Sequence, residues 1–265
     1  MSFFTLYFIA IALLMTSPLK AEVRQRQPSL QILSVEFPPF TYQDSNGEAA
    51  GFMSEVLREV LKEMRRPEVR VDFMPWKRAY ILASENRNTL IYPVATVPSE
   101  RDKLFYWLGP KMKRAIWIYA LKADAAKLRL KNREGLKGKL VGVTRDYSWG
   151  DLLQKFGAKV DETIDDHILI LKLAGRRMPY MAMDEDVENA TMKLMVQQDP
   201  AFVPPALEKI VMLSSEGVRT FGLSKKSNPE LLAEFKRAFT SIEKRGVVKK
   251  IEARYPELDF VHRGL

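Results

Sequence analysis

The chain has 265 residues, of which 46% are hydrophobic and 10% aromatic, and it carries a formal net charge of +9 with no cysteine. This length allows two modest domains with filled cores, and the apolar content excludes a chain that is mainly disordered. The absence of cysteine excludes a disulfide framework, thiol catalysis, thiolate metal sites and a lipid anchor on an amino-terminal cysteine.

The chain begins with an apolar run, at positions 3–15, that is too short to span a bilayer comfortably. Small and polar residues follow it up to Ala21, which predicts a secretory signal peptide over residues 1–21. The alternative is an uncleaved membrane anchor, but no second hydrophobic segment of spanning length follows. We therefore expect a soluble protein of the periplasm that is not a lipoprotein.

The net charge falls from +9 to +8 when Lys20 leaves with the signal peptide. The basic residues alternate with acidic ones, as in Arg58-Glu59 and Lys62-Glu63, which is typical of solvated helix faces. The sequence has no basic stripe interleaved with aromatic residues, so we expect no nucleic-acid partner. The excess charge favours solubility and attraction to acidic solutes.

The first part of the mature chain predicts alternating strands and helices. Residues 30–36 are expected to form a strand, which two prolines end, and residues 51–64 carry the apolar spacing of one helix face. A strand over 69–73, a helix over 77–84 and a strand over 90–94 follow. This β-α-β-α-β order predicts a largely parallel sheet covered by helices.

The segment after the third strand has the composition of an anion-binding corner. The strand breaks at Val97-Pro98, and Ser99 is expected to cap a short helix whose free backbone NH groups stand beside Arg101. An arginine next to such donors suits a carboxylate. Taken alone, however, Arg101 reads more simply as a surface arginine paired with Glu100 or Asp102.

The second part of the chain predicts another series of strands and helices, after a strand over 114–121 and a first crossing between domains near Ala120. The expected strands and helices alternate until a proline-containing loop at 199–205, and the last strand is expected to return to the first domain. The strands are expected at 139–144, 159–160, 180–183, 210–213 and 220–223, and the helices at 149–156, 165–174 and 187–196, with a last helix that begins after Asn228.

Several short motifs, in this order, resemble the type II periplasmic solute-binding proteins of the branch that carries polar amino acids to ABC importers, family 3. They are EFPPFTY at 36–42 followed by Gly51-Phe52, TVPSER at 96–101, VGV at 141–143, YMAMD at 180–184 and NPELL at 228–232. The resemblance implies an α/β fold with two Rossmann-like lobes, joined by two crossing hinge segments, that close on a ligand. Lobe one would comprise residues 22–120 and 221–265, and lobe two residues 121–220.

The resemblance also implies the site residues of lobe one. Phe37 and Trp76 would sandwich the side chain of the ligand, although core packing is the commoner role of such aromatic residues. Thr96 and Arg101 would bind the α-carboxylate, unless the Thr96 hydroxyl is satisfied within its own turn.

In lobe two, the resemblance places Tyr147 and Ser148 on the turn whose backbone donors complete the carboxylate clamp. Asp184 would receive the ammonium, with Asp186 as the alternative, and either residue could instead cap the helix that follows. The chain departs from the family pattern with Asp146-Tyr147, where Gly-Thr is frequent. A bulky tyrosine and an added acid would reshape the clamp, so solutes other than standard amino acids are also expected.

The implied function is to capture an amino acid or related small zwitterion and to deliver it to an inner-membrane ABC permease. We expect no catalytic residue, cofactor or metal, and a monomer. An enzyme on the same scaffold that dehydrates prephenate-like substrates is an alternative, with Asp184, Asp186 or Glu36 as the general acid. A receptor for a membrane sensor is a second alternative, and the sequence does not distinguish it from a transport protein.

Overall fold

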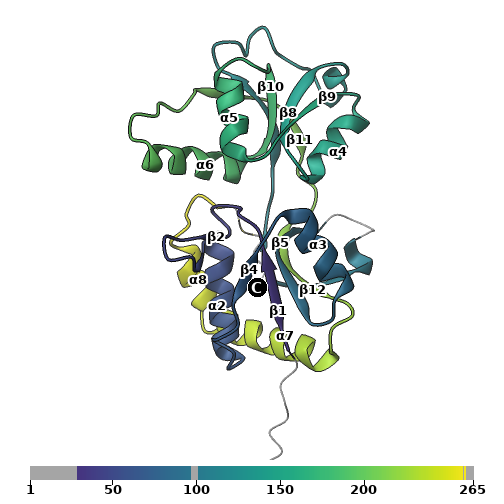
Figure 1. The fold of residues 1–265 in the computed structure, drawn as a ribbon, viewed down its shortest axis with the longest axis vertical. Helices are drawn as coiled ribbons and strands as arrows, with labels where there is room; N and C mark the ends of the chain where they lie inside the picture. Colours follow the sequence, from purple (N-terminus) through teal and green to yellow (C-terminus); the bar gives the residue numbers. More distant parts are fainter. Residues whose placement is uncertain (1–28, 97–100, 259, 261–265) are drawn as a thin grey trace, which may run out of the picture.

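The computed structural model describes residues 29–96, 101–258 and 260. Within them the chain forms two five-stranded sheets, and Figure 1 shows them in two lobes joined by two connecting segments. This architecture confirms the predicted α/β fold with two lobes. The predicted signal peptide, residues 1–21, and the predicted helix cap Ser99 lie outside the described residues.

Lobe one is built on a sheet with strand order β4-β1-β5-β12-β6. Strand β1 is parallel to β4 and β5, and β12 is antiparallel to both β5 and β6. A small hairpin, a 3-10 turn and four helices complete this lobe. The elements are β1 (Gln31–Ser34), β2 (Tyr42–Gln43), β3 (Ala49–Ala50), α2 (Phe52–Glu63), β4 (Val71–Phe73), α3 (Trp76–Glu85), β5 (Thr89–Ala95), η1 (Arg101–Lys103), β6 (Phe105–Met112), β12 (Arg219–Ser224), α7 (Pro229–Lys244) and α8 (Val247–Glu252).

Helix α2 shows why the sequence pattern predicts lobe one well. Its apolar residues recur at helical spacing and are buried, whereas its charged residues lie on the other face. The helix begins after Gly51, which has a φ of 94°. A Cβ at Gly51 would lie 2.6 Å from the carbonyl oxygen of Pro39, so only glycine fits this close approach.

Lobe two is built on a sheet with strand order β11-β7-β10-β8-β9. Strands β10, β8 and β9 are parallel, and β7 is antiparallel to both β10 and β11. Helices α4 and α5 pack on the parallel strands. The elements are β7 (Ile116–Leu121), η2 (Arg133–Leu136), β8 (Leu140–Thr144), α4 (Ser148–Lys155), β9 (Lys159–Thr163), α5 (Asp166–Ala174), β10 (Tyr180–Asp184), α6 (Glu185–Gln198) and β11 (Leu207–Ser214).

Strand β6 and helix α8 were not predicted from the sequence. Strand β6 contains Gly109 and Pro110, which weigh against a strand, but β6 lies at the edge of the sheet, where a missing backbone donor is tolerated. Helix α8 is a short helix that starts after the left-handed Gly246, so it offers too few turns for a clear periodic pattern.

The first crossing between the lobes lies earlier in the chain than predicted. Strand β7 pairs with β10 and β11 of lobe two, so the chain leaves lobe one at residues 113–115 rather than near Ala120. It returns at residues 215–218, because β12 already belongs to the sheet of lobe one from Arg219. The sequence could not reveal this shift, since the apolar run at 116–121 fits the core of either sheet.

Candidate functional site

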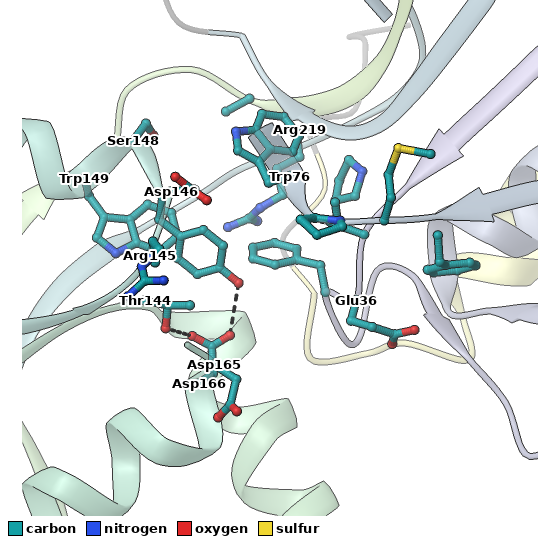
Figure 2. A pocket seen from close by; sticks show the side chains of 18 of the residues that line it. Glu36, Trp76, Thr144, Arg145, Asp146, Ser148, Trp149, Asp165, Asp166 and Arg219 are labelled. Carbon is teal, nitrogen blue, oxygen red and sulfur yellow. Dashed lines mark hydrogen bonds between the residues drawn. The ribbon is translucent and has the colours of Figure 1, made fainter. Parts of the chain in front are cut away.

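A cleft of about 630 Å³ lies between the two lobes. Its walls are the ends of β1, β4 and β5 with the start of α3 in lobe one, and the β8–α4 and β9–α5 connections in lobe two. Parallel strands end at the same edge of a sheet, so both lobes present strand ends and helix starts to this space. Figure 2 shows side chains from both lobes converging on it.

Two aromatic residues of lobe one, Phe37 and Trp76, line the cleft as predicted. Phe37 is nearly buried, and its ring centroid lies 5.6 Å from that of Phe40 and 5.6 Å from that of Tyr147 in lobe two. Trp76 is half-buried and packs against Tyr80, with 5.7 Å between centroids. Phe37 therefore packs across the two lobes as well as facing the space.

Arg101 also lines the cleft. Its Nη1 donates to the carbonyl oxygen of Ala95 at 3.0 Å. The guanidinium lies over the rings of Trp76 and Tyr80, at 5.6 and 5.3 Å from their centroids. These contacts hold the cation at the wall of lobe one.

Thr96 is not among the residues that line the cleft. Its backbone NH donates to the carbonyl oxygen of Val218 at 2.8 Å, and its Oγ1 accepts from the NH of Val218 at 3.0 Å. The structure therefore does not place Thr96 on the cleft wall, and the proposed site does not use its hydroxyl. Thr96 ties the end of β5 to the returning connection, a contact between residues 122 positions apart that the sequence does not reveal.

The predicted ammonium acceptor, Asp184, lies outside the cleft with a fully buried side chain. Its Oδ2 accepts from Nη2 of Arg219, and its Oδ1 accepts from the NH of Asp186 at 3.2 Å at the start of α6. Asp186 also lies outside the cleft, with Oδ2 at 3.4 Å from Nη1 of Arg219. Because a cation of the chain itself occupies Asp184, its predicted role is corrected.

Arg219 is nearly buried and belongs to lobe one, whereas Asp184 belongs to lobe two. Its Nη1 donates to the carbonyl oxygen of Lys113 at 3.0 Å, and its guanidinium lies 4.4 Å from the centroid of the Phe40 ring. Burial and the nearby Arg114 lower the pKa of Arg219, but the adjoining Asp184 carboxylate favours the charged form.

Tyr147 and Ser148 lie on the cleft wall of lobe two, where the sequence places them. Ser148 is the first residue of α4, so the first NH groups of that helix have no partner within the helix. The hydroxyl of Tyr147 donates to Oδ2 of Asp166 at 3.1 Å, and Oγ1 of Thr144 donates to Oδ1 of Asp166 at 2.5 Å (Figure 2). Burial outweighs these two donors and raises the pKa of Asp166.

Asp146, the added acid in the β8–α4 turn, lines the cleft beside these residues. It is exposed, and its backbone has a φ of 65°. Figure 2 shows its carboxylate on the side of the turn that faces Trp76 of lobe one. Asp146 therefore places a negative charge opposite the wall that carries Arg101.

The family model of the bacterial extracellular solute-binding proteins, family 3, matches residues 32–257 of this chain. The chain belongs to this family. The match confirms the resemblance that the ordered motifs predict, and it covers both lobes and both connections between them.

Among curated relatives, the L-cystine-binding protein TcyJ of Escherichia coli (strain K12) is 28% identical over 148 residues. The aligned part is 55% of this chain and 54% of that protein, so the chain spans about half the length of the curated relatives it matches. The similarity is that of a distant relative.

Solved structures share the fold across most of the chain. An ancestral arginine-binding protein bound to arginine has a TM-score of 0.64 at 24% identity, and covers 85% of this chain and 97% of its own. A histidine kinase sensor domain with similarity to periplasmic binding proteins has a TM-score of 0.70 at 17% identity, with 88% and 98% covered. At these identities the likeness shows the type II periplasmic binding fold alone.

This family 3 protein carries a further cation in its cleft that the sequence-based prediction missed. Arg114 lies on the first connection between the lobes, lines the cleft and is only 8% exposed. Its guanidinium has no hydrogen bond or ion pair with any of the residues that the structure describes. Burial, and then the charge of Arg101, lower the pKa of Arg114 to about 10. In the sequence Arg114 is a single arginine before an apolar strand, and this pattern does not predict a buried cation in a cleft.

The described part of this family 3 protein was compared with the requirements of a metal-ligand cluster and of a membrane-spanning helix, and it meets neither. Across residues 29–96 and 101–258, no three His, Cys, Asp or Glu side chains gather in a way that would hold a metal ion. Over the same ranges, no helix is both long and apolar enough to cross a bilayer.

Proposed function

We propose that this chain is a periplasmic solute-binding protein that captures an amino acid or a related small zwitterion and delivers it to an ABC importer. The observation that carries the proposal is the cleft between the lobes, in which Arg101 on one wall stands opposite Asp146 on the other. A small molecule with a carboxylate and an ammonium matches such a pair of walls.

In this proposal Arg101 and the first NH groups of α4 bind the carboxylate. A guanidinium offers a planar fork of donors, and a helix amino terminus adds unpaired NH groups and a partial positive charge. Phe37, Trp76 and Tyr147 supply apolar surface for the rest of the solute. Phe37, Trp76, Arg101, Tyr147 and Ser148 thus have the ligand-binding roles in this proposal that the resemblance implies.

Asp146 replaces Asp184 as the proposed acceptor of the ammonium. Asp184 is occupied by Arg219, and both oxygens of Asp166 already accept hydrogen bonds from hydroxyl groups. No described residue forms a hydrogen bond or ion pair with the Asp146 carboxylate. Its place in the turn that leads into α4 also puts it next to the NH groups proposed for the carboxylate.

Closure of the lobes would remove the bound solute from water. The two connections at residues 113–115 and 215–218 are the places where the backbone can change direction, and the bonds between Thr96 and Val218 brace one of them. Hinge closure of this kind excludes water and strengthens the interactions between charges in the cleft. Delivery would require the closed form to dock on a membrane permease.

Related proteins support the amino-acid class of solute. TcyJ is named for L-cystine, and structures of similar fold are described as bound to arginine and glutamine. These ligands share an α-carboxylate and an α-ammonium, which are the groups that the two walls match.

Isothermal titration against the standard amino acids and L-cystine tests the proposal. We expect at least one to bind with micromolar affinity or tighter, and Arg101→Gln and Asp146→Asn each to weaken that binding at least about tenfold, because each removes a charge-assisted contact. Asp151→Asn, an exposed position farther along α4, is the matched control and should bind normally. Absence of binding by any amino acid would refute the proposal.

A dehydratase on the same scaffold is a second candidate, and Asp166 is the observation that favours it. This carboxyl group lines the cleft, and its raised pKa is what a general acid requires. Of the acids first considered for this role, Asp184 and Asp186 lie outside the cleft, whereas Glu36 lines it. Loss of prephenate absorbance on addition of the protein would support an enzyme. Unchanged absorbance would argue against the dehydratase and favour the binding role.

A receptor that signals through a membrane sensor uses the same closure. The similar fold of a histidine kinase sensor domain shows that this scaffold also occurs in signalling proteins. A pull-down from membranes in the presence of bound solute distinguishes the two, because an importer and a sensor kinase differ in mass and composition.

A further inference from the structure

We infer that the solute of this cleft carries a second acidic group, in addition to its α-carboxylate, and that Arg114 binds this group. The inference rests on the proposed function and narrows it to solutes such as an amino acid with an acidic side chain or one with two carboxylates.

The first reason is that Arg114 is a buried cation with no hydrogen bond or ion pair to any described residue. The charge of Glu216 favours its charged form, but Glu216 forms no ion pair with it. A charged group that is only 8% exposed normally has a hydrogen-bonded counter-ion, because its desolvation is otherwise uncompensated. No described residue supplies one to Arg114, yet its side chain reaches the cleft. Proteins keep such a group where a ligand provides the missing anion.

The second reason is that the other arginines of the cleft are engaged by the protein. Arg219 is paired with Asp184, and Arg145 at the exposed rim lies 3.4 Å from Glu162. Arg101 donates to the carbonyl of Ala95 and lies over two aromatic rings. Arg114 therefore differs from all three in having no hydrogen bond, ion pair or ring contact with the residues described.

The third reason is the repulsion between neighbouring cations. The charge of Arg101 is one of the causes that lower the pKa of Arg114, so the two guanidinium groups are close enough to repel each other. An α-amino acid with one carboxylate offers a single negative group, which the proposed site assigns to Arg101 and α4. A second acidic group would neutralise Arg114, and a cleft of about 630 Å³ has room for a solute of that size.

The test compares matched pairs of solutes by isothermal titration. L-glutamate is paired with L-glutamine, which has an amide in place of the side-chain carboxylate. L-cystine is paired with S-methyl-L-cysteine, which lacks the second amino-acid half. We expect the wild-type protein to bind at least one diacid about tenfold or more tightly than its partner, since a charge-assisted bond to a buried guanidinium is lost in the partner.

The variant Arg114→Gln keeps amide donors and removes the charge. It should reduce the preference for the diacid to about threefold or less while leaving the affinity for the monocarboxylate partner unchanged, and Arg114→Lys should retain part of the preference. Arg176→Gln is the matched control, because Arg176 is an exposed arginine of lobe two that pairs with Asp124. The control should keep the wild-type preference.

Three results would overturn the inference. One is tightest binding of a solute with a single carboxylate by the wild-type protein. Another is an equal loss of affinity for both members of a pair in Arg114→Gln, which would mean that Arg114 shares the α-carboxylate with Arg101. The third is a wild-type preference that survives in Arg114→Gln. If no amino acid binds at all, the proposed function fails together with the inference, which is a different result from these three.

Discussion

The guanidinium of Arg219 in lobe one contacts the carboxylate of Asp184 in lobe two, and both side chains are buried. The pair spans the interface between lobes that also carries the edge-on contact of Phe37 with Tyr147. Each charge compensates the burial of the other, and neither is available to a solute. The pair therefore explains both the contact between the lobes and the shift of the proposed ammonium site to Asp146.

Removal of one member of this pair should destabilise the protein strongly. Asp184→Ala leaves Arg219 buried without its main counter-ion, and we expect the free energy of unfolding to fall by about 3–5 kcal/mol. Urea denaturation followed by circular dichroism measures this change.

The double variant Asp184→Leu with Arg219→Met tests whether an unpaired buried charge causes this loss of stability. Replacing both charges with apolar groups of similar volume should cost clearly less than Asp184→Ala, because no unpaired charge remains. A double variant as unstable as the sum of the two single variants would contradict a compensated ion pair.

The buried charge of Arg114 should destabilise the ligand-free protein. Its pKa of about 10 lies well below the ordinary value of an arginine, so the charged guanidinium is less stable in the folded than in the unfolded state. Arg114→Met should therefore raise the free energy of unfolding, by about 1–3 kcal/mol after allowance for relaxation of the site. A thermal melt without solute measures the gain, and a lower melting temperature would indicate a structural role instead.

The stabilising effect of Arg114→Met should also depend on pH. The folded state loses this proton near pH 10, before the unfolded state does, so the wild-type penalty is complete below about pH 10 and shrinks as the pH rises above it. The difference between the variant and the wild type should therefore be constant from pH 6 to 9.

Asp166 gives a second pH dependence of stability, in the acidic range. Burial raises its folded pKa above the ordinary 3.8, so the folded state holds this proton more tightly than the unfolded state does. The contribution of Asp166 to stability should decrease as the pH rises from about 3.8 through the folded pKa. Asp166→Asn removes that decrease, and unfolding free energies of both proteins from pH 4 to 7 test it.

Tryptophan fluorescence should report solute binding directly. Trp76 of lobe one and Trp149 of lobe two both line the cleft, so closure changes the polarity around each indole. We expect a change in intensity or wavelength that saturates with the solute found by titration. Trp76→Phe should reduce it, whereas Trp107→Phe, a tryptophan of β6 that is not among the cleft residues, should not.

The fold was predictable because each lobe is made of local patterns. The buried face of α2 and the apolar strands of both sheets appear in the sequence at the spacing that helices and strands require. Where the pattern was ambiguous, as in β6 with its glycine and proline, the prediction failed. The position of the first crossing failed for a related reason, since the pairing partners of β7 are decided by tertiary structure.

The candidate site was only partly predictable, because charge pairing is a long-range property. The sequence places Phe37, Trp76, Arg101, Tyr147 and Ser148 on segments that the structure brings to one cleft. It could not show that Arg219, which is 35 positions away from Asp184 in the sequence, pairs with the Asp184 carboxylate. Nor could it show that Arg114 is a buried cation with no hydrogen bond or ion pair to a described residue, since burial and contacts exist only in the folded chain.

A crystal structure of the protein with its tightest-binding amino acid tests the central claim most directly. We predict density for the solute between the lobes, with a carboxylate within hydrogen-bonding distance of Arg101 and an ammonium beside Asp146. A solute bound elsewhere, or bound in the cleft with its ammonium on Asp184 after displacement of Arg219, would contradict the account.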